Sequence, residues 1–277
     1  MQNVKMFMMA ALPLLLSLPA GAVAASSPKP LKVFLLAGQS NMNGQAAVAA
    51  LPANLKRPQK SVLVWNGSVW TPLDKGNADI VVMQLQRGKP SRTFGPEMTF
   101  GPAMARYFGQ PIGIIKVAYG GTNLAVNWSP YRKHSLYARL VRSVKGARKA
   151  RPIVIIGMIW MQGENDARHE AMAQAYKKNL THLIKTARKD FGNPALPFVC
   201  GRITQLSSFS PTFPYSDTVR KAQAAIHLPA YRLINTDDLP RLNARDPHYN
   251  VTGMQELGKR FARAMIALLK QEKKAPK

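Results

Sequence analysis

The chain has 277 residues, with 39 Lys and Arg against 13 Asp and Glu, which gives a formal net charge of +26. The positive electrostatic field of such a chain attracts nucleic acid, anionic lipid headgroups or acidic polysaccharide. Alternatively, the basic residues only form the solvated faces of helices. No nucleic-acid-binding motif accompanies the charge, so no nucleic-acid partner is expected, and the single cysteine, Cys200, excludes an internal disulfide.

The N-terminus has the composition of a secretory signal peptide. Lys5 precedes an apolar run over residues 6–19, and small residues end in Ala22-Val23-Ala24. This pattern predicts cleavage after Ala24 and export to the periplasm or the medium, with residues 1–24 as the signal peptide. An uncleaved membrane anchor is the alternative, but the run is short for a membrane span. No later segment is apolar enough to cross a bilayer, so we expect no stable span after cleavage.

Residues 25–277 are about the length of one α/β domain. Short β-like runs alternate with helical patterns, which predicts a three-layer α/β/α sandwich around a mainly parallel sheet. Asn66-Gly67 between residues 61–65 and 68–70 indicates a hairpin with a type I′ turn. Five strands are expected in the central sheet, at residues 31–37, 111–117, 152–160, 198–203 and 231–235. Helices are expected at residues 135–149, 167–191, 217–226 and 251–269.

Ligands of parallel sheets bind at the carboxyl ends of the strands, so the residues that follow each strand are the first candidates for a site. The first strand runs into Gly38-Gln39-Ser40-Asn41-Met42, which presents a serine where a helix could begin. The strand at 111–117 is followed by Gly120-Gly121-Thr122, whose N–H groups could hold an oxyanion. A helix N-cap and a tight glycine turn are the corresponding structural interpretations.

Two further polar segments follow the same pattern. Trp160-Met161-Gln162-Gly163-Glu164-Asn165-Asp166 places polar groups directly after an apolar strand, where they line a site or tie neighbouring loops together. Asp246-Pro247-His248 precedes the C-terminal helix, and a carboxylate beside an imidazole is what the activation of a serine requires. All four features are expected at one edge of the sheet.

These motifs resemble those of the SGNH hydrolases, in particular the sialate O-acetylesterase and acetylxylan esterase branch. The resemblance extends from about Leu31 to about Leu269. It implies a flavodoxin-like SGNH fold and a serine esterase that removes acetyl groups from a carbohydrate without a metal or cofactor. By the same resemblance, Ser40 is the nucleophile and His248 is its general base.

The resemblance also implies the remaining site residues. The oxyanion hole would comprise the backbone N–H of Ser40, that of Gly121 or Gly120, and the side-chain amide of Gln162. Asn165 is a rival for the amide, because Gly163-Glu164-Asn165-Asp166 contains the Gly-x-Asn-Asp block of the superfamily. The residues implied as substrate contacts are Gln39, Asn41, Thr122 and Glu164.

The acid of the triad departs from the family pattern. That pattern is usually Asp-x-x-His, whereas here Arg245 occupies the expected position and Asp246 lies two residues before His248. Asp246 is one candidate for orienting the imidazole. Asp237, Asp238 and Glu164 are others, and a Ser-His dyad without an acid is a further alternative.

Other functions remain open at this level. A binding protein for carbohydrate or the cell envelope, and a lipid or thioester hydrolase on the same scaffold, are the competing hypotheses. The sugar is not identified, and the basic clusters at residues 132–151 and 270–277 suggest an anionic polysaccharide or envelope surface as a partner. The other histidines lack metal-ligand spacing, and we interpret them as surface or packing residues: His134, His169, His182 and His227.

Overall fold

The computed structural model describes residues 29–75, 79, 92–208 and 210–272. The predicted signal peptide, residues 1–24, lies outside the described residues and stays a prediction. Within the described ranges, no helix is both long and apolar enough to cross a membrane.

A seven-stranded sheet forms the centre of the molecule, in the order β4-β3-β6-β1-β7-β8-β9. All neighbouring strands are parallel except β3 and β4, which form an antiparallel hairpin at one edge. The strands are β1 (Leu31–Gly38), β3 (Gln59–Trp65), β4 (Trp70–Leu73), β6 (Ile112–Ala118), β7 (Ile153–Met161), β8 (Phe198–Gly201) and β9 (Tyr231–Ile234).

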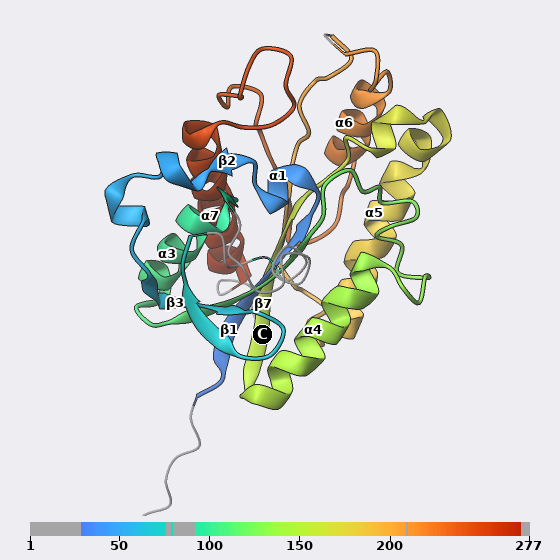
Figure 1. Cartoon of the computed structure of the whole chain (residues 1–277). Coiled ribbons are helices and arrows are strands. Elements are labelled where there is room, and N and C mark those ends of the chain that lie inside the picture. Colours follow the sequence, from blue (N-terminus) through green and yellow to red (C-terminus); the bar gives the residue numbers. More distant parts are fainter. Residues whose placement is uncertain (1–28, 76–78, 80–91, 209, 273–277) are drawn as a thin grey trace, which may run out of the picture.

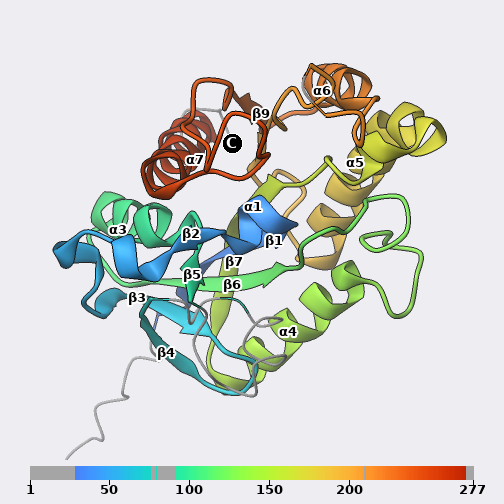
Figure 2. The same ribbon diagram turned by 45° about the horizontal axis from the view of Figure 1, so that its top comes forward.

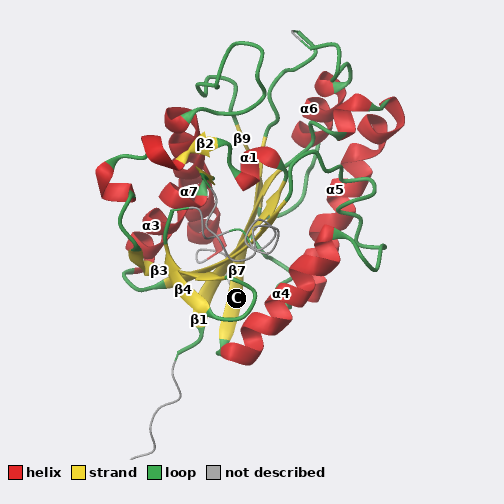
Figure 3. Cartoon of the chain, in the orientation of Figure 1, coloured by secondary structure: helices red, strands yellow, loops and turns green. Residues whose placement is uncertain are grey.

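Helices cover both faces of this sheet, as Figures 1 and 3 show. One face carries α3 (Glu97–Phe108) and α7 (Val251–Glu272), which pack against each other. The other face carries α4 (Leu136–Ala150), α5 (Glu170–Asp190) and α6 (Ser216–Ala224). Figure 2 shows the sheet between the two helical layers, which confirms the predicted three-layer α/β/α architecture.

Short elements connect the main ones. α1 (Ser40–Asn43) follows β1 directly, and β2 (Ala46–Ala47) pairs with β5 (Thr93–Phe94) in a separate two-stranded sheet. The described part of the chain also contains three single-turn 3₁₀ helices in connecting loops, at Val48–Ala50, Ala53–Leu55 and Asp166–Arg168.

β1 is the buried axis of the fold, because it lies between β6 and β7 and is covered on both faces. Its side chains alternate between two cores: Val33 and Leu35 pack towards α4 and α5, whereas Phe34 and Leu36 pack towards α3 and α7. All four side chains have no exposed surface. A continuous apolar run is typical of such a strand, since neither of its faces meets water.

The central sheet has seven strands and not the five expected from the sequence. The hairpin at β3 and β4 joins the sheet, because β3 pairs in parallel with β6 from Val62 to Val64 and buries both of these valines. The turn also differs from the expected type I′. Four residues, 66–69, connect the paired Trp65 and Trp70, and Gly67 alone among them has a positive φ.

α3 was not anticipated from the sequence, because Gly101 and Pro102 lie inside it and both weaken a helical pattern. Tertiary packing explains the glycine: a Cβ at Gly101 would lie 2.9 Å from Cγ1 of Val62 on β3. The other predicted helices and strands are confirmed with boundary shifts of up to three residues.

Candidate active site

Ser40 lies in a tight turn at the carboxyl end of β1. Gly38 has a φ of +153°, and a Cβ there would lie 2.0 Å from the carbonyl oxygen of Met161 on β7. The next residue, Gln39, donates its backbone N–H to the same oxygen at 2.9 Å. Only glycine fits so close an approach, so the Gly-Gln-Ser sequence holds the serine at the start of α1.

His248 contacts Ser40 across 208 residues of chain. Its Nε2 lies 2.9 Å from the Ser40 Oγ, and its Nδ1 lies 2.7 Å from Oδ1 of Asp246. The imidazole and the carboxylate are about a quarter exposed, at 28% and 26%, whereas Ser40 is 9% exposed. The three side chains therefore form a connected chain that opens to solvent.

A local turn explains how Asp246 reaches the imidazole from only two positions away. Asp246 Oδ1 accepts the backbone N–H of His248 at 2.8 Å as well as contacting its ring. The loop is closed at its base by the backbone N–H of Leu242, which donates to the His248 carbonyl at 2.9 Å. An aspartate that bonds the backbone two residues ahead forms an Asx turn, and this turn substitutes for the longer family spacing.

Asn41 ties this loop to the serine turn. Its Nδ2 donates to the carbonyl of Pro247 at 3.0 Å and to Glu164 Oε1 at 3.2 Å, and its Oδ1 accepts the backbone N–H of Tyr249 at 3.3 Å. The side chain is fully buried. Its expected role as a substrate contact is therefore not supported, and its bonds instead hold both neighbours of His248.

The backbone N–H groups of Ser40, Gly120 and Gly121 lie near the serine side chain and have no acceptor among the described residues. The last two follow β6, and a Cβ at Gly120 would lie 3.6 Å from that of Ser40, so this turn passes directly beside Ser40. Unused donors at this place can stabilise negative charge on a substrate oxygen.

These groups open into a pocket of about 340 Å³, which we call the ester pocket. Asn165 lines it with a partly exposed side chain, and its backbone N–H donates to Gln39 Oε1 at 3.4 Å. The full lining is Gln39, Ser40, Gln45, Gly120, Gly121, Glu164, Asn165, Arg168, Phe213, Pro247 and His248.

Gln162 lies beneath this pocket and not in its wall. Its Nε2 has three acceptors within 3.3 Å: the carbonyl of Thr122, Oδ2 of Asp166 and Oε1 of Gln39. Because an amide has only two hydrogens, Gln162 has no donor left for a substrate. The geometry does not support Gln162 as an oxyanion donor and leaves Asn165 as the side-chain candidate.

Asp166 completes this buried group. Its carboxylate accepts the backbone N–H groups of Leu124 at 2.8 Å and Ala125 at 3.2 Å, which fixes the loop after Gly120-Gly121. Burial raises its pKa to about 6, and the donated hydrogen bonds oppose that rise. The Tyr176 hydroxyl donates to the backbone carbonyl of Gln162 at 2.7 Å, and we call Gln162, Asp166 and Tyr176 together the buried bracket.

Of the other expected substrate contacts, Gln39 and Glu164 line the ester pocket, whereas Thr122 lines a neighbouring hollow. Burial raises the pKa of Glu164, while the hydrogen bond from Asn41 and the nearby His248 lower it. Glu164 does not contact the imidazole Nδ1, which Asp246 occupies.

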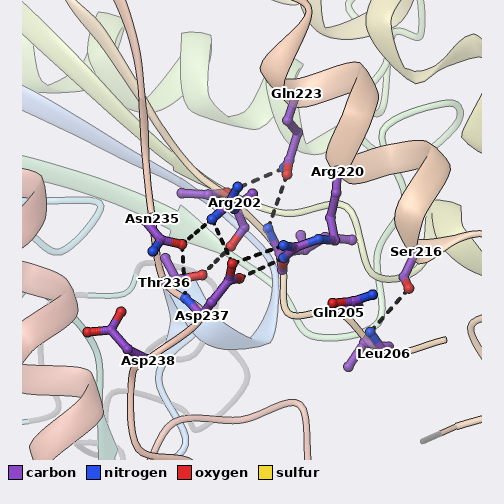
Figure 4. Close-up of polar contacts among 12 residues, drawn as sticks. Arg202, Gln205, Leu206, Ser216, Arg220, Gln223, Asn235, Thr236, Asp237 and Asp238 are labelled. Carbon is purple, nitrogen blue, oxygen red and sulfur yellow. Dashed lines mark hydrogen bonds and ion pairs between the residues drawn. The ribbon is translucent and has the colours of Figure 1, made fainter. Parts of the chain in front are cut away.

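Asp237 and Asp238 are engaged elsewhere. Asp237 pairs with Arg202 at 2.6 Å and with Arg220 at 2.8 Å, as Figure 4 shows. Asp238 pairs with Arg260 at 2.6 Å. These arginines lower the pKa of both carboxyls. Among the candidate acids, only Asp246 contacts His248 Nδ1 in the described part of the chain.

Gln45, Arg168 and Phe213 also line the ester pocket and were not identified from the sequence. They come from loops with no reactive motif, and only the position of Arg168 just after Asp166 offered a signal. The described residues contain no group of three His, Cys, Asp or Glu side chains that could hold a metal ion.

The comparison with protein families matches residues 30–267 to the family described as "Carbohydrate esterase, sialic acid-specific acetylesterase". The chain belongs to this family. Carbohydrate esterases hydrolyse carboxylic ester bonds, so this member is a hydrolase acting on an ester.

One Arabidopsis protein, compared both by its sequence and by its solved structure, illustrates the likeness of this carbohydrate esterase to a known protein. The "Probable carbohydrate esterase" of Arabidopsis thaliana is 27% identical over 249 residues, which cover 86% of this chain and 91% of that protein. The solved Arabidopsis structure has a TM-score of 0.69 at 26% identity and covers 86% of this chain and 98% of that one.

Two more solved structures share the fold at lower identity. NanS has a TM-score of 0.68 at 17% identity, with 88% of this chain and 99% of that chain covered. A carbohydrate acetylesterase from Xanthomonas citri has a TM-score of 0.61 at 20% identity, with 86% and 56% covered. These two likenesses concern the fold alone.

Proposed function

We propose that this carbohydrate esterase removes O-acetyl groups from a sugar by a Ser-His-Asp mechanism, with Ser40 as nucleophile, His248 as general base and Asp246 as its orienting acid. The observation that carries the proposal is the pair of contacts on one imidazole. Nε2 lies 2.9 Å from the Ser40 Oγ and Nδ1 lies 2.7 Å from Asp246. A serine activated in this way attacks ester carbonyls.

In the first step, the Ser40 Oγ bonds to the acetyl carbonyl carbon while His248 Nε2 takes the hydroxyl proton. The carbonyl oxygen becomes negative and is held by the N–H groups of Ser40 and Gly121 or Gly120, with the amide of Asn165 as side-chain donor. The intermediate collapses, the bond to the sugar oxygen breaks, and His248 returns its proton to that oxygen.

In the second step, water attacks the acetyl-serine while His248 accepts one of its protons. The bond to the Ser40 Oγ then breaks, His248 gives the proton back to this oxygen, and acetate leaves. Asp246 stabilises the imidazolium that forms in each step without taking the proton itself.

The test is Ser40→Ala, assayed with p-nitrophenyl acetate and with an acetylated sugar. We expect kcat to fall about 10⁴-fold or more, because no other group supplies the nucleophile. The circular dichroism spectrum and Tm should match those of the wild type, since the substitution removes only an oxygen at the pocket surface. Undiminished hydrolysis by this variant would remove Ser40 from the mechanism.

The binding-protein alternative is distinguished by covalent labelling. An activated serine reacts with an organophosphate, whereas an idle hydroxyl does not. Stoichiometric labelling at Ser40 in the wild type, and its loss in His248→Ala, supports the esterase. A lipid or thioester hydrolase would instead prefer long-chain over acetyl esters.

A further inference from the structure

A second hollow lies beside the ester pocket and shares a wall with it. We call it the basic groove: it has a volume of about 570 Å³, and its lining includes Tyr119, Thr122, Arg132, Lys133 and His134. Tyr119 and Thr122 flank Gly120-Gly121 in the sequence, and these glycines line the ester pocket. The two hollows therefore lie on either side of one turn.

The basic side chains that line the groove have no carboxylate partner in the described part of the chain. Arg132, Lys133 and His134 are exposed, their side chains make no ion pair there, and no Asp or Glu lines the groove. An anion entering this groove would meet positive charge that no neighbouring carboxylate neutralises.

Two other basic hollows differ in this respect. In one, Arg202 and Arg220 already share Asp237. In the other, Arg260 and Arg263 share Glu256. Each of these hollows keeps only one basic side chain without an ion pair among the described residues, Lys221 in the first and Arg232 in the second. The basic groove has two adjacent ones, Arg132 and Lys133, so it is the stronger candidate.

The wall between the groove and the ester pocket is held in place before any ligand arrives. The Thr122 hydroxyl donates to the Tyr119 carbonyl at 2.7 Å and accepts from Trp128 Nε1 at 3.2 Å. The far side is fixed by the backbone N–H of Leu136, which donates to the Asn127 carbonyl at 2.8 Å. A pre-formed wall lowers the entropic cost of binding.

Tyr119 adds a surface for a sugar ring. It is 44% exposed, and it directly precedes the two glycines of the shared turn. A half-exposed aromatic ring offers an apolar body with a polar tip, which suits the apolar face and hydroxyl edge of a sugar. The groove thus combines an aromatic ring with free cations next to the reactive serine.

We infer that the basic groove is a second binding subsite, which holds a carboxylated sugar unit adjoining the acetylated unit in the ester pocket. The substrate would then be an acidic oligosaccharide or polysaccharide chain and not a single sugar. This inference rests on the proposed function, because it assigns the neighbouring unit of the same substrate. Arg132 and Lys133 bind the carboxylate, and Tyr119 packs against the ring.

The test compares acetylated oligogalacturonides with the same oligomers after carboxyl reduction and re-acetylation. Arg132→Gln combined with Lys133→Gln should lower kcat/KM about tenfold on the carboxylated chain, since two exposed ion pairs are lost. The reduced chain and p-nitrophenyl acetate should be cleaved within about twofold of the wild-type rate. Added salt should shrink the difference between the two chains in the wild type.

A matched control removes the same charge elsewhere. Arg142 and Lys145 are exposed on α4 and do not line the groove. Arg142→Gln combined with Lys145→Gln should leave the preference for the carboxylated chain unchanged. Equal losses in both double variants would show a general field effect and overturn the subsite, as would an unchanged preference in the Arg132/Lys133 variant.

Binding without turnover separates this inference from the proposed function. Non-acetylated oligogalacturonide should bind Ser40→Ala, and its Kd should rise about tenfold when Arg132 and Lys133 are also replaced. That result supports the groove even if the wild type fails to release acetate. Single-stranded DNA that binds as tightly, with the same loss in the variant, would reveal a general polyanion site and overturn the carbohydrate assignment.

Discussion

Two groups of polar residues lie at the carboxyl edge of the same sheet. They differ in whether their side-chain hydrogen-bond donors are still free. The proposed catalytic rim, which comprises Ser40, Asn165, Asp246 and His248, is partly exposed, and the Asn165 side-chain amide has no partner among the described residues. In the buried bracket, every donor of Gln162 is already used, and neither Gln162 nor Asp166 is exposed. Hydrogen-bond donors that stay free beside a pocket are available to a substrate. Donors that are all paired beneath the pocket hold the surrounding loops in place.

Asp246→Asn should have the largest effect of the variants that test this contrast. The amide can present a donor to Nδ1 and favour the wrong tautomer, so kcat/KM should fall about 10³- to 10⁴-fold, while urea unfolding changes little. Steady-state kinetics with p-nitrophenyl acetate measures this. Asp237→Asn, which removes a carboxylate paired only with arginines, is the control and should stay within about threefold. A reversed order would move the orienting acid away from Asp246.

Asn165→Ala should have the next largest effect. Loss of one oxyanion donor costs about 10²- to 10³-fold in kcat. KM should change little, because the donor acts mainly on the transition state. A silent Asn165→Ala, measured by the same kinetics, would mean that the backbone donors suffice and that Asn165 does not belong to the rim.

Gln162→Ala, in the buried bracket, should lower the stability of the fold. It leaves buried partners unsatisfied at the Thr122 carbonyl and at Asp166, so the free energy of unfolding should fall by about 3 kcal/mol in urea titrations. Gln174→Ala on the exposed face of α5 is the matched control, with a change below about 0.5 kcal/mol. Full stability with lost turnover would instead place Gln162 in the chemistry.

The smallest expected effect is a pH dependence of stability. Burial raises the pKa of Asp166 to about 6, so the folded chain holds this proton more tightly than the unfolded chain does. The resulting stabilisation is complete below a pH of about 4 and is lost as the pH rises through about 6.

The stability of the wild type relative to Asp166→Asn should therefore fall by about 2 kcal/mol between pH 4 and pH 6. Urea unfolding at several pH values measures this difference, and taking the difference removes contributions from the other carboxyls. A difference that does not vary with pH would show that Asp166 titrates alike in both states.

The sequence predicts the parts of this molecule that depend on local pattern. The apolar runs of β1, β6 and β7 predict buried parallel strands, and the residues that follow them include Ser40 and Gly120-Gly121. The sequence likewise predicts that His248 lies just before the C-terminal helix, α7. In each case the chemical type of a few neighbouring residues decides the outcome.

The parts that sequence reasoning missed depend on contacts between distant segments. Gln162 and Asn165 are both amides after one strand, and only the acceptors that surround Gln162 show which of them is saturated. Likewise, the close contact of Gly101 with β3 explains a helix that its own sequence disfavours. Contacts of this kind cannot be predicted from the few residues that surround each position in the sequence.

The central position of β1 determines how firmly each member of the proposed catalytic pair, Ser40 and His248, is held in place. Ser40 continues a strand enclosed by β6 and β7, so displacing the hydroxyl requires the middle of the sheet to open. His248 belongs to a half-exposed loop anchored at Leu242 and Asn41. The position of Ser40 is therefore as stable as the sheet itself, whereas the contact between Ser40 and His248 depends on a few hydrogen bonds that anchor the histidine loop.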